Sequence, residues 1–383
     1  MITNALMLHC GLSWRPGFGL LFRRVSRLWS VYASALIGQI MNLKTLSEHL
    51  GLSQTTVSRA LNGYPEVSEK TRQRVLESAR KLNYSPNARA KGLATGKSMA
   101  IGHVIARSSR HEMVNPVFGD YTAGAGESYS AAGYDMLISL VDDDNEEQFY
   151  RAIKSKGNVD GLIVHGPKME DTRIDLLSSL GLPFLSHGRA SNVTRNYAWL
   201  DVNNCRAFQR ATEFLLDLGH RRIALLNGLE FLDFAHRRRQ GYIKALAGRG
   251  LEPEPALMRS DEMTEIYGYR ETRAMLEADD PPTAVLCSSI ISAIGVRRAL
   301  SDAGLTMGRD VSVITYDDDL SYMSNGQEVP IFTATRSSVR EAGRLSAQML
   351  LDMIRNPGLP LPTHLMEADL IIGQSTGPAP NHT

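Results

Sequence analysis

Cysteine is scarce in this chain, and long apolar runs are missing. Among 383 residues there are 3 cysteines, at positions 10, 205 and 287. Cysteines so widely separated give no disulfide framework, and no apolar stretch is long enough to span a membrane. The spacing of histidine and cysteine indicates no metal site. These absences predict a cytoplasmic protein that needs no metal or other cofactor.

The near-neutral total charge hides a strong asymmetry along the sequence. The formal net charge is +1, yet residues 41–97 carry ten Lys and Arg against four acidic residues. Residues 98–383 come to −9 and the first forty residues to +4. A basic N-terminal segment followed by an acidic remainder is typical of a phosphate-binding module attached to a soluble sensor.

The most informative segment is LKTLSEHLGLSQTTVSRALN, at residues 43–62. Leu43, Leu46 and Leu50 recur at steps of three and four, so one face of a short helix is apolar. Gly51 then allows a backbone turn that a side chain would hinder. The pattern predicts a helix-turn-helix, the element with which many proteins bind double-stranded DNA.

The second helix is expected to begin after Ser53, because a serine hydroxyl is a natural N-cap. Val57 and Leu61 return this helix to the first one. A third helix, beginning near Ser68, closes a three-helix core with further apolar residues at steps of four and three. These residues are Val75, Ala79 and Leu82.

Polar side chains remain on or near the outer face of the second helix. In a major groove, Gln is suited to adenine, Arg to guanine and Thr to the thymine methyl group. A helix pair of this size is often only a packing unit, but the excess of positive charge argues against that interpretation. The candidate DNA-binding residues of this segment are Leu43, Lys44, Ser53, Gln54, Thr55, Thr56, Ser58, Arg59 and Asn62.

The run TVSRALNGYPEVSEKTRQRVLESARKLNYSPNARAKGL, at residues 56–93, resembles the headpiece of the LacI/GalR family of bacterial transcription regulators. The likeness continues to about Thr376. It implies a homodimer whose two headpieces bind a pseudo-palindromic DNA operator in the nucleoid. It also implies a small-molecule effector, bound in a separate domain, that changes the affinity for the operator.

In that family a hinge helix follows the headpiece and becomes ordered when two subunits bind an operator. The resemblance places the hinge at Asn87 to Ala94, with Leu93 as an apolar wedge that enters the minor groove. Gly92 and Gly96 would keep the segment flexible away from DNA. The hinge residues that the resemblance assigns to DNA binding are Asn87, Arg89, Ala90 and Leu93.

The remaining part, roughly 280 residues, alternates between apolar, strand-like runs and helical stretches and is too long for one comfortable core. Such alternation predicts doubly wound parallel sheets. Together with the resemblance, it gives the expected fold class: an all-α helix-turn-helix headpiece followed by a two-lobed, periplasmic-binding-protein-like α/β sensor. The expected strands are 100–106, 135–140, 161–165, 184–187, 223–226, 284–287 and 311–316.

These patterns divide the chain into five parts. Residues 1–40 contain an arginine-rich, signal-like stretch, and we expect them to be an extension from an upstream start codon, absent from or disordered in the working protein. The other parts are a headpiece at 41–86, a hinge at 87–97, an effector-binding and dimerisation domain at 98–378 and a tail at 379–383. The expected lobes are lobe 1 at about 98–202 and 334–360, and lobe 2 at about 203–333 and 361–378.

The resemblance also indicates effector-binding residues. Arg238 falls on the family's effector-binding arginine, whose planar fork suits vicinal hydroxyls or a carboxylate. Asn115 and Phe118 open the first helix of the sensor, where the family often lines its cleft, although Phe118 is equally consistent with a helix core. His187 and Arg189 come at the C-terminal end of a predicted parallel strand, where open α/β sheets bind ligands.

One departure from the family pattern bears on the ligand. The family carries an Asn-Asp pair before a late helix of the sensor, and the aspartate of this pair binds ligand hydroxyls. In this sequence Ser289 and Ile290 occupy the two positions. Either Ser288 and Ser289 supply the hydrogen bonds, or the ligand is not a typical free sugar. Near the C-terminus, Gly373 likewise replaces the family's usual arginine.

Three enzyme-like patterns are incomplete. GLATGKS at 92–98 has three residues between its glycines where a P-loop requires four. GAGESY at 124–129 lacks the third glycine of a dinucleotide fingerprint. GQSTG at 373–377 has no downstream aspartate to complete a Ser-His-Asp triad. We therefore expect that the protein is not an enzyme.

Around SHGRA at 186–190 and the CSS run at 287–289, the chain resembles regulators of α-glucoside uptake and breakdown. We expect a repressor of carbohydrate-utilisation genes that a sugar effector releases from its operator. One alternative is a regulator that senses a nucleoside or a phosphorylated metabolite as corepressor. The other alternative is a sugar-binding module without regulatory output.

Overall fold

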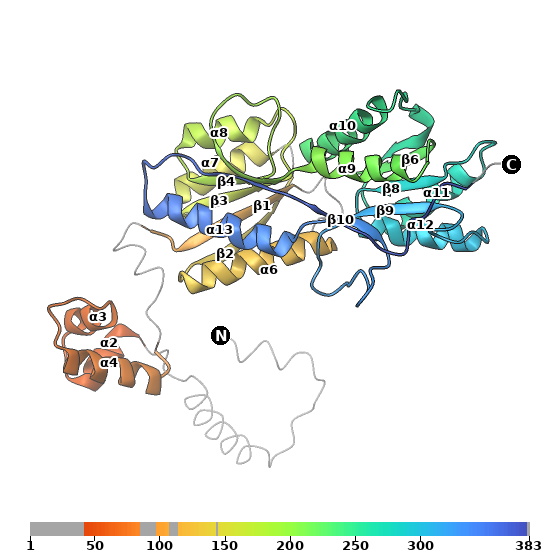
Figure 1. Ribbon diagram of the computed structural model, residues 1–383. Helices are drawn as coiled ribbons and strands as arrows, with labels where there is room; N and C mark the ends of the chain where they lie inside the picture. The colour runs from red at the N-terminus through yellow and green to blue at the C-terminus, as the bar shows by residue number, and fades with distance from the viewer. Residues whose placement is uncertain (1–41, 85–96, 107–113, 143–144, 381–383) are drawn as a thin grey trace, which may run out of the picture. The chain divides into compact units, whose positions relative to one another are not determined.

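The computed structural model describes residues 42–84, 97–106, 114–142 and 145–380. The chain divides into two compact units, with the division between residues 94 and 95. In its described part the first unit is all-helical, and the second unit contains two six-stranded sheets with their helices (Figure 1). The predicted fold class, an all-α headpiece and a two-lobed α/β sensor, is confirmed.

The headpiece helices are α2 (Leu43–Leu50), α3 (Gln54–Leu61) and α4 (Glu69–Lys81). Asn42, Ser53 and Ser68 precede them, and the side-chain oxygen of each accepts a hydrogen bond from a backbone N–H of the helix that follows. Gly51 ends α2 with a φ of 63°, in the left-handed region that favours glycine. The turn predicted at this glycine is therefore present.

These three helices enclose a small apolar core. Val57, at the centre of α3, is fully buried between α2 and α4 residues. The predicted three-helix core is confirmed. Its buried members are Leu46, Leu50, Val57, Ala60, Val67, Val75 and Ala79.

The first sheet of the second unit has the order β11-β5-β4-β3-β1-β2, and its strand pairs are all parallel. Its strands are β1 (Ala100–Ala106), β2 (Asp135–Val141), β3 (Gly161–His165), β4 (Phe184–His187), β5 (Ala198–Val202) and β11 (Thr363–Met366). Its helices are α6 (Pro116–Ala131), α7 (Glu146–Lys156), α8 (Thr172–Leu180) and α13 (Val339–Arg355). We call this sheet and these helices lobe 1.

Helices cover both faces of the lobe 1 sheet, with α6 and α13 on one face and α7 and α8 on the other (Figure 1). Successive residues of β3 therefore enter different cores. Ile163 packs with residues of α6 and α13, whereas Leu162 packs with residues of α7 and α8. A strand buried on both faces reads as a continuous apolar run, which is why the sequence predicted β3 to the residue.

The second sheet has the order β12-β10-β9-β8-β6-β7, and only the pair of β10 with β12 is antiparallel. Its strands are β6 (Ile223–Asn227), β7 (Met258–Ser260), β8 (Ala284–Cys287), β9 (Ser312–Asp317), β10 (Thr333–Arg336) and β12 (Asp369–Ile371). Its helices are α9 (Asn204–Asp217), α10 (Asp233–Ala247), α11 (Glu265–Leu276) and α12 (Ile290–Asp302), with the short 3₁₀ helix η3 (Pro255–Leu257) before β7. We call this part lobe 2.

The chain crosses between the lobes after β5, returns after β10, and crosses again after β11. We expected lobe 1 to resume at about residue 334 and to end at about residue 360. Instead, β10 extends lobe 2 to Arg336, and β11 adds Thr363–Met366 to lobe 1. The runs TATR and THLM contain too few apolar residues to be recognised as strands from sequence.

Within the described ranges, no helix is both long enough and apolar enough to cross a membrane.

Candidate functional site

Helix α3 presents a polar face to solvent. Gln54, Thr55 and Arg59 are exposed, whereas Val57 and Ala60 face the headpiece core. None of the three exposed side chains forms a hydrogen bond or ion pair with a residue that the structure describes. Their amide, hydroxyl and guanidinium groups are therefore available to the edges of base pairs.

Three other predicted contact residues hold the ends of α3. The hydroxyl oxygens of Ser53 and Thr56 are 2.8 Å apart, and the Thr56 backbone N–H donates to Ser53 Oγ at 3.0 Å. At the other end, Asn62 Nδ2 donates to the Ser58 carbonyl at 2.9 Å. These capping bonds use part of the hydrogen-bonding capacity of Ser53, Thr56 and Asn62, so they are weaker candidates for reading bases.

Two predicted residues lie at the start of α2. The Lys44 side chain is 72% exposed, and its Nζ is 4.0 Å from a Glu48 carboxylate oxygen, a contact worth little at the surface. It is therefore free to reach a phosphate. Leu43 packs half-buried against the headpiece core. The remaining predicted DNA contacts, Asn87, Arg89, Ala90 and Leu93, lie outside the described residues.

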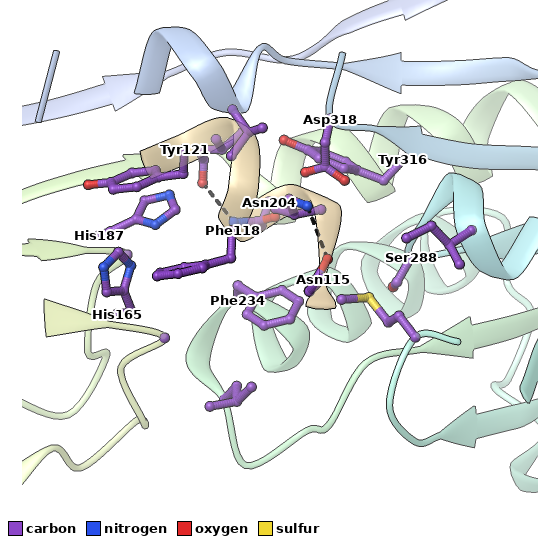
Figure 2. A pocket seen from close by; sticks show the side chains of 18 of the residues that line it. Asn115, Phe118, Tyr121, His165, His187, Asn204, Phe234, Ser288, Tyr316 and Asp318 are labelled. Atoms are coloured by element: carbon purple, nitrogen blue, oxygen red, sulfur yellow. Dashed lines mark hydrogen bonds between the residues drawn. The ribbon is translucent and has the colours of Figure 1, made fainter. Parts of the chain in front are cut away.

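A cavity of about 400 Å³ lies between the two lobes (Figure 2). Its wall includes His165 at the end of β3, His187 at the end of β4 and Tyr316 near the end of β9. Open α/β sheets bind ligands at these carboxyl ends of their strands. The cavity is therefore the candidate small-molecule site, and its volume lies in the range of roughly 300–1,000 Å³ that such sites have.

Most of the predicted effector-binding residues reach this cavity. The residues concerned are Asn115, Phe118, His187, Arg238 and Ser288.

Arg189 and Ser289 do not line the cavity. Arg189 Nε donates to Asp201 Oδ2 at 2.7 Å, so its guanidinium supports the β5 end. Ser289 is the N-cap of α12, and its Oγ accepts from the Ile291 N–H at 3.2 Å. Their places in the sequence bring both residues near the cleft, but the direction of each side chain depends on neighbours that the sequence does not reveal.

Arg238, on α10, is held on three sides. Its Nε donates to Asn204 Oδ1 at 2.8 Å, and its Nη1 donates to the Ser288 carbonyl at 2.6 Å. The guanidinium lies over the Tyr316 ring, 4.0 Å from its centroid. Burial lowers the pKa of Arg238, and Tyr316 and Asp318 oppose that shift, so the group stays charged. A side-chain hydrogen bond with Tyr316 also acts against the lowering of this pKa. Nη2 takes part in neither the bond to Asn204 nor the bond to Ser288.

Asp318 supplies a carboxyl group that the sequence had indicated was missing. Ile290 is buried in the core, whereas Asp318 follows β9 and lines the cavity. The Asp318 side chain forms no hydrogen bond or ion pair with a described residue. Burial raises its pKa to about 7, although Arg238 acts in the opposite direction. The acidic run directly after a predicted strand was the signal for this residue.

The middle of the cavity is aromatic. Figure 2 shows Phe118 and Phe234 between two histidines on one side and Tyr316, Asp318 and Ser288 on the other. Phe118 is 6% exposed and packs edge-on against His165, so it belongs both to the core of lobe 1 and to the cavity wall. An aromatic surface of this kind packs on the apolar C–H face of a ring-shaped ligand.

A histidine cluster lies behind the lobe 1 wall. His103 Nδ1 is 3.0 Å from His165 Nε2, and His187 stacks on Tyr121 with ring centroids 4.1 Å apart. Burial lowers the pKa of His103 to about 3 and that of His187 to about 4, and it lowers the pKa of His165 well below the ordinary value. All three imidazoles are therefore neutral at pH 7. Among the described residues, no group of three or more His, Cys, Asp or Glu is arranged to hold a metal ion.

Two buried aspartates join the lobes beside the cavity. Asp233 of lobe 2 accepts from the Ser191 N–H at 2.9 Å, and its own N–H donates to the Pro167 carbonyl at 2.9 Å. Asp120 of lobe 1 accepts from the Ser321 N–H at 2.6 Å and from its hydroxyl at 2.7 Å. A change in the relative orientation of the lobes must rearrange these contacts.

A helix-turn-helix unit combined with a two-lobed unit that encloses a ligand-sized cavity defines a ligand-responsive DNA-binding regulator. Comparisons with known proteins give the family. Residues 44–87 match the family model of bacterial regulatory proteins of the lacI family, and residues 212–376 match that of a periplasmic binding protein-like domain.

Curated relatives match along most of the chain. The HTH-type transcriptional regulator AglR of Rhizobium meliloti (strain 1021) is 44% identical over 344 residues, which cover 90% of this chain and 96% of AglR. The HTH-type transcriptional regulator RafR of Escherichia coli is 34% identical over 278 residues, which cover 72% of this chain and 82% of RafR. Both relatives are transcriptional regulators.

Solved structures agree. The Lac repressor dimer bound to operator and the anti-inducer ONPF has a TM-score of 0.76 at 25% identity, covering 88% of this chain and 100% of that one. The complex of the transcriptional regulator CelR with cellobiose has a TM-score of 0.65 at 25% identity, covering 88% and 99%. The chain belongs to the LacI family and is a helix-turn-helix transcriptional regulator.

Proposed function

We propose that the protein is a homodimeric repressor of carbohydrate-utilisation genes, which a sugar bound between the lobes releases from the operator. The lining of the cavity carries this proposal. It combines the faces of Phe118 and Phe234 with the fork of Arg238 and the carboxyl of Asp318. A sugar ring offers C–H faces to the aromatics and hydroxyls that both donate and accept hydrogen bonds.

Two observations favour a neutral saccharide over a phosphorylated metabolite. Asp318 brings a carboxyl group into the cavity, which disfavours a phosphorylated metabolite by charge repulsion once that group is ionised. CelR, which shares the fold, forms a complex with cellobiose. Within the saccharides we favour α-glucosides, because of the resemblance of the chain around residues 186–190 and 287–289 to regulators of their use.

The effector acts by contacting both lobes. Asn115 and His165 belong to lobe 1, whereas Arg238 and Asp318 belong to lobe 2, so a ligand that bridges them favours one relative orientation of the lobes. Coupling between two sites typically amounts to about 1–3 kcal/mol, or 5–150-fold in affinity. By thermodynamic reciprocity, an inducer that weakens operator binding is itself bound more weakly by the operator complex.

The proposed partner is a pseudo-palindromic operator in the cytoplasm. In a dimer, two α3 helices would enter major grooves about one helical turn apart, roughly 34–36 Å. The Lac repressor, which has the same fold, binds its operator as a dimer. The net charge of +6 over residues 41–97 supports contact with the phosphate backbone.

The proposal is tested by measuring operator binding in the presence of candidate effectors. Fluorescence anisotropy would follow the full-length protein on labelled DNA from its own upstream region, with maltose, trehalose, sucrose, cellobiose and glucose added separately. We expect at least one α-glucoside to weaken the complex at micromolar to millimolar concentration. Tight, sequence-specific DNA binding that none of these sugars changes would count against a sugar effector.

Asp318 is expected to make sugar affinity depend on pH. Because the pKa of Asp318 is raised to about 7, its carboxyl is mostly protonated at pH 6 and ionised at pH 8. An ionised carboxylate is the stronger acceptor for sugar hydroxyls, so affinity should rise about three- to tenfold over this range. The neighbouring His103 and His187 titrate far below it. Calorimetric titration of wild type and Asp318→Asn should show the rise only in wild type; affinity that falls with pH would contradict the assignment.

Gln54 and Thr55 are expected to read base identity. Replacing either with alanine should cost about 1–3 kcal/mol on the operator and should relax base preference at particular positions. Lys44→Ala should instead weaken binding to all sequences and flatten its salt dependence. Competition binding with single-base operator variants distinguishes these patterns. Equal losses on specific and random DNA from Thr55→Ala would remove that residue from the readout.

A further inference from the structure

A hydrogen-bonded chain runs from the core of lobe 1 to the wall of the cavity. The Tyr129 hydroxyl, on α6, is 3.2 Å from His103 Nε2, on β1. His103 Nδ1 is in turn 3.0 Å from His165 Nε2, at the end of β3. Tyr129 and His103 are fully buried, whereas His165 lines the cavity.

The buried hydroxyl of Tyr129 determines which atom donates in each of these hydrogen bonds. The Tyr129 hydroxyl has no hydrogen-bond partner among the described residues other than His103 Nε2. A buried phenolic proton that no atom accepts is costly, so His103 Nε2 must be the acceptor. A neutral imidazole carries one proton, and therefore His103 carries its proton on Nδ1.

The same reasoning determines which nitrogen of His165, at the cavity wall, carries the proton. His103 Nδ1–H donates to His165 Nε2, which must be unprotonated. Neutral His165 therefore carries its proton on Nδ1. No described residue accepts a hydrogen bond from that nitrogen, and the His165 ring borders the cavity beside Phe118 and His187 (Figure 2).

We propose that Tyr129 and His103 are positioning residues that hold His165 as the Nδ1–H tautomer, so that His165 donates a hydrogen bond to an oxygen of the effector. The inference rests on the proposed function in that the effector occupies this cavity. It narrows the ligand class: an oxygen acceptor meets His165 in lobe 1, while hydroxyl donors meet Asp318 in lobe 2. A ligand with an amino group at the lobe 1 end meets a donor there and is rejected.

The tautomers can be measured without any effector. In the full-length protein labelled with ¹⁵N-histidine, long-range ¹H–¹⁵N spectra distinguish a protonated from an unprotonated ring nitrogen, and the loss of signals in His103→Asn and His165→Asn assigns the resonances. We expect His103 and His165 to be protonated at Nδ1 and unprotonated at Nε2, with no change between pH 6 and pH 8. A His165 protonated at Nε2 would overturn the proposal even if a sugar binds.

Two substitutions then separate donation to the effector from support of His103. Asn places its amide nitrogen at the level of Nδ1, whereas Gln places it at the level of Nε2. We expect His165→Gln to bind maltose, or whichever sugar dissociates the operator complex, at least tenfold more weakly than His165→Asn does. His364→Gln, at an exposed histidine of β11, is the matched control and should bind as wild type does.

Weaker sugar binding by His165→Asn than by His165→Gln, or an equal loss of sugar affinity in both variants, would overturn the proposal. Thermal unfolding of each variant shows whether the fold is kept. If wild type binds no sugar at all, the proposed function fails. The tautomer measurement still decides which atoms donate in the hydrogen bonds that join Tyr129, His103 and His165.

Discussion

Replacing Arg238 with alanine is expected to remove effector binding while the protein still binds its operator. Arg238 is buried, donates to Asn204 and to the Ser288 carbonyl, and stacks on Tyr316, so no other side chain takes its place. Truncating a buried, hydrogen-bonded charge costs about 2–5 kcal/mol, or roughly 30- to several-thousand-fold in affinity. In cells, the variant should repress without responding to inducer. Calorimetry for the sugar and anisotropy for the operator would measure both effects.

Two further variants isolate the role of the guanidinium fork. Arg238→Lys keeps the positive charge but loses the planar set of donors, so it should recover only a small part of the lost affinity. Lys244→Ala changes an exposed cation on the same helix and should leave sugar binding unaltered. Wild-type sugar affinity in Arg238→Ala would show that the ligand lies elsewhere.

Leu46→Ala is expected to abolish operator binding and to spare the sensor. Leu46 is fully buried in the headpiece core, and a leucine-to-alanine change in such a place costs about 2–5 kcal/mol. A unit of this size has little stability to lose, because small domains bury a limited apolar area. Unfolding the headpiece disperses the α3 side chains that read DNA. We expect operator affinity to fall more than 100-fold, which anisotropy can measure.

The sensor provides the internal control for this variant. Its cores lie around the two sheets and share no residue with the headpiece core, so sugar affinity should stay within about twofold of wild type. Gln73→Ala, at an exposed position of α4, should leave operator binding nearly unchanged. Normal operator binding by Leu46→Ala would contradict the assignment of residues 43–81 as the DNA-binding unit.

Much of the fold follows from local patterns in the sequence. The caps at Ser53 and Ser68 and the turn at Gly51 are decided by residues a few positions apart, so the headpiece helices were predictable. Strands such as β3 and β8 are apolar on both faces, and their limits were predicted to the residue. In contrast, β10 and β12 are short, lie at or next to an edge of their sheet and owe their place to pairing with distant strands.

The binding site was less predictable because it is assembled from both lobes. Arg238 was found through resemblance to a family, but its partners Asn204 and Tyr316 lie 34 and 78 positions away in the sequence. Asp318 was not predicted as a site residue because an acidic residue after a strand is usually a solvated loop residue. The role of His103 was not predicted because a single histidine within an apolar strand indicates no partner until the fold brings His165 beside it. Such residues acquire their roles only through tertiary contacts.

The central claim is that the interlobe cavity and the operator-binding surface are coupled. It is tested most directly by a complete thermodynamic cycle: operator affinity with and without saturating sugar, and sugar affinity with and without saturating operator. We expect both pairs to change by the same factor, about 5–150-fold, each ligand weakening the other. If a sugar binds the cavity with the same affinity in the presence and absence of operator, the protein is not a sugar-released repressor.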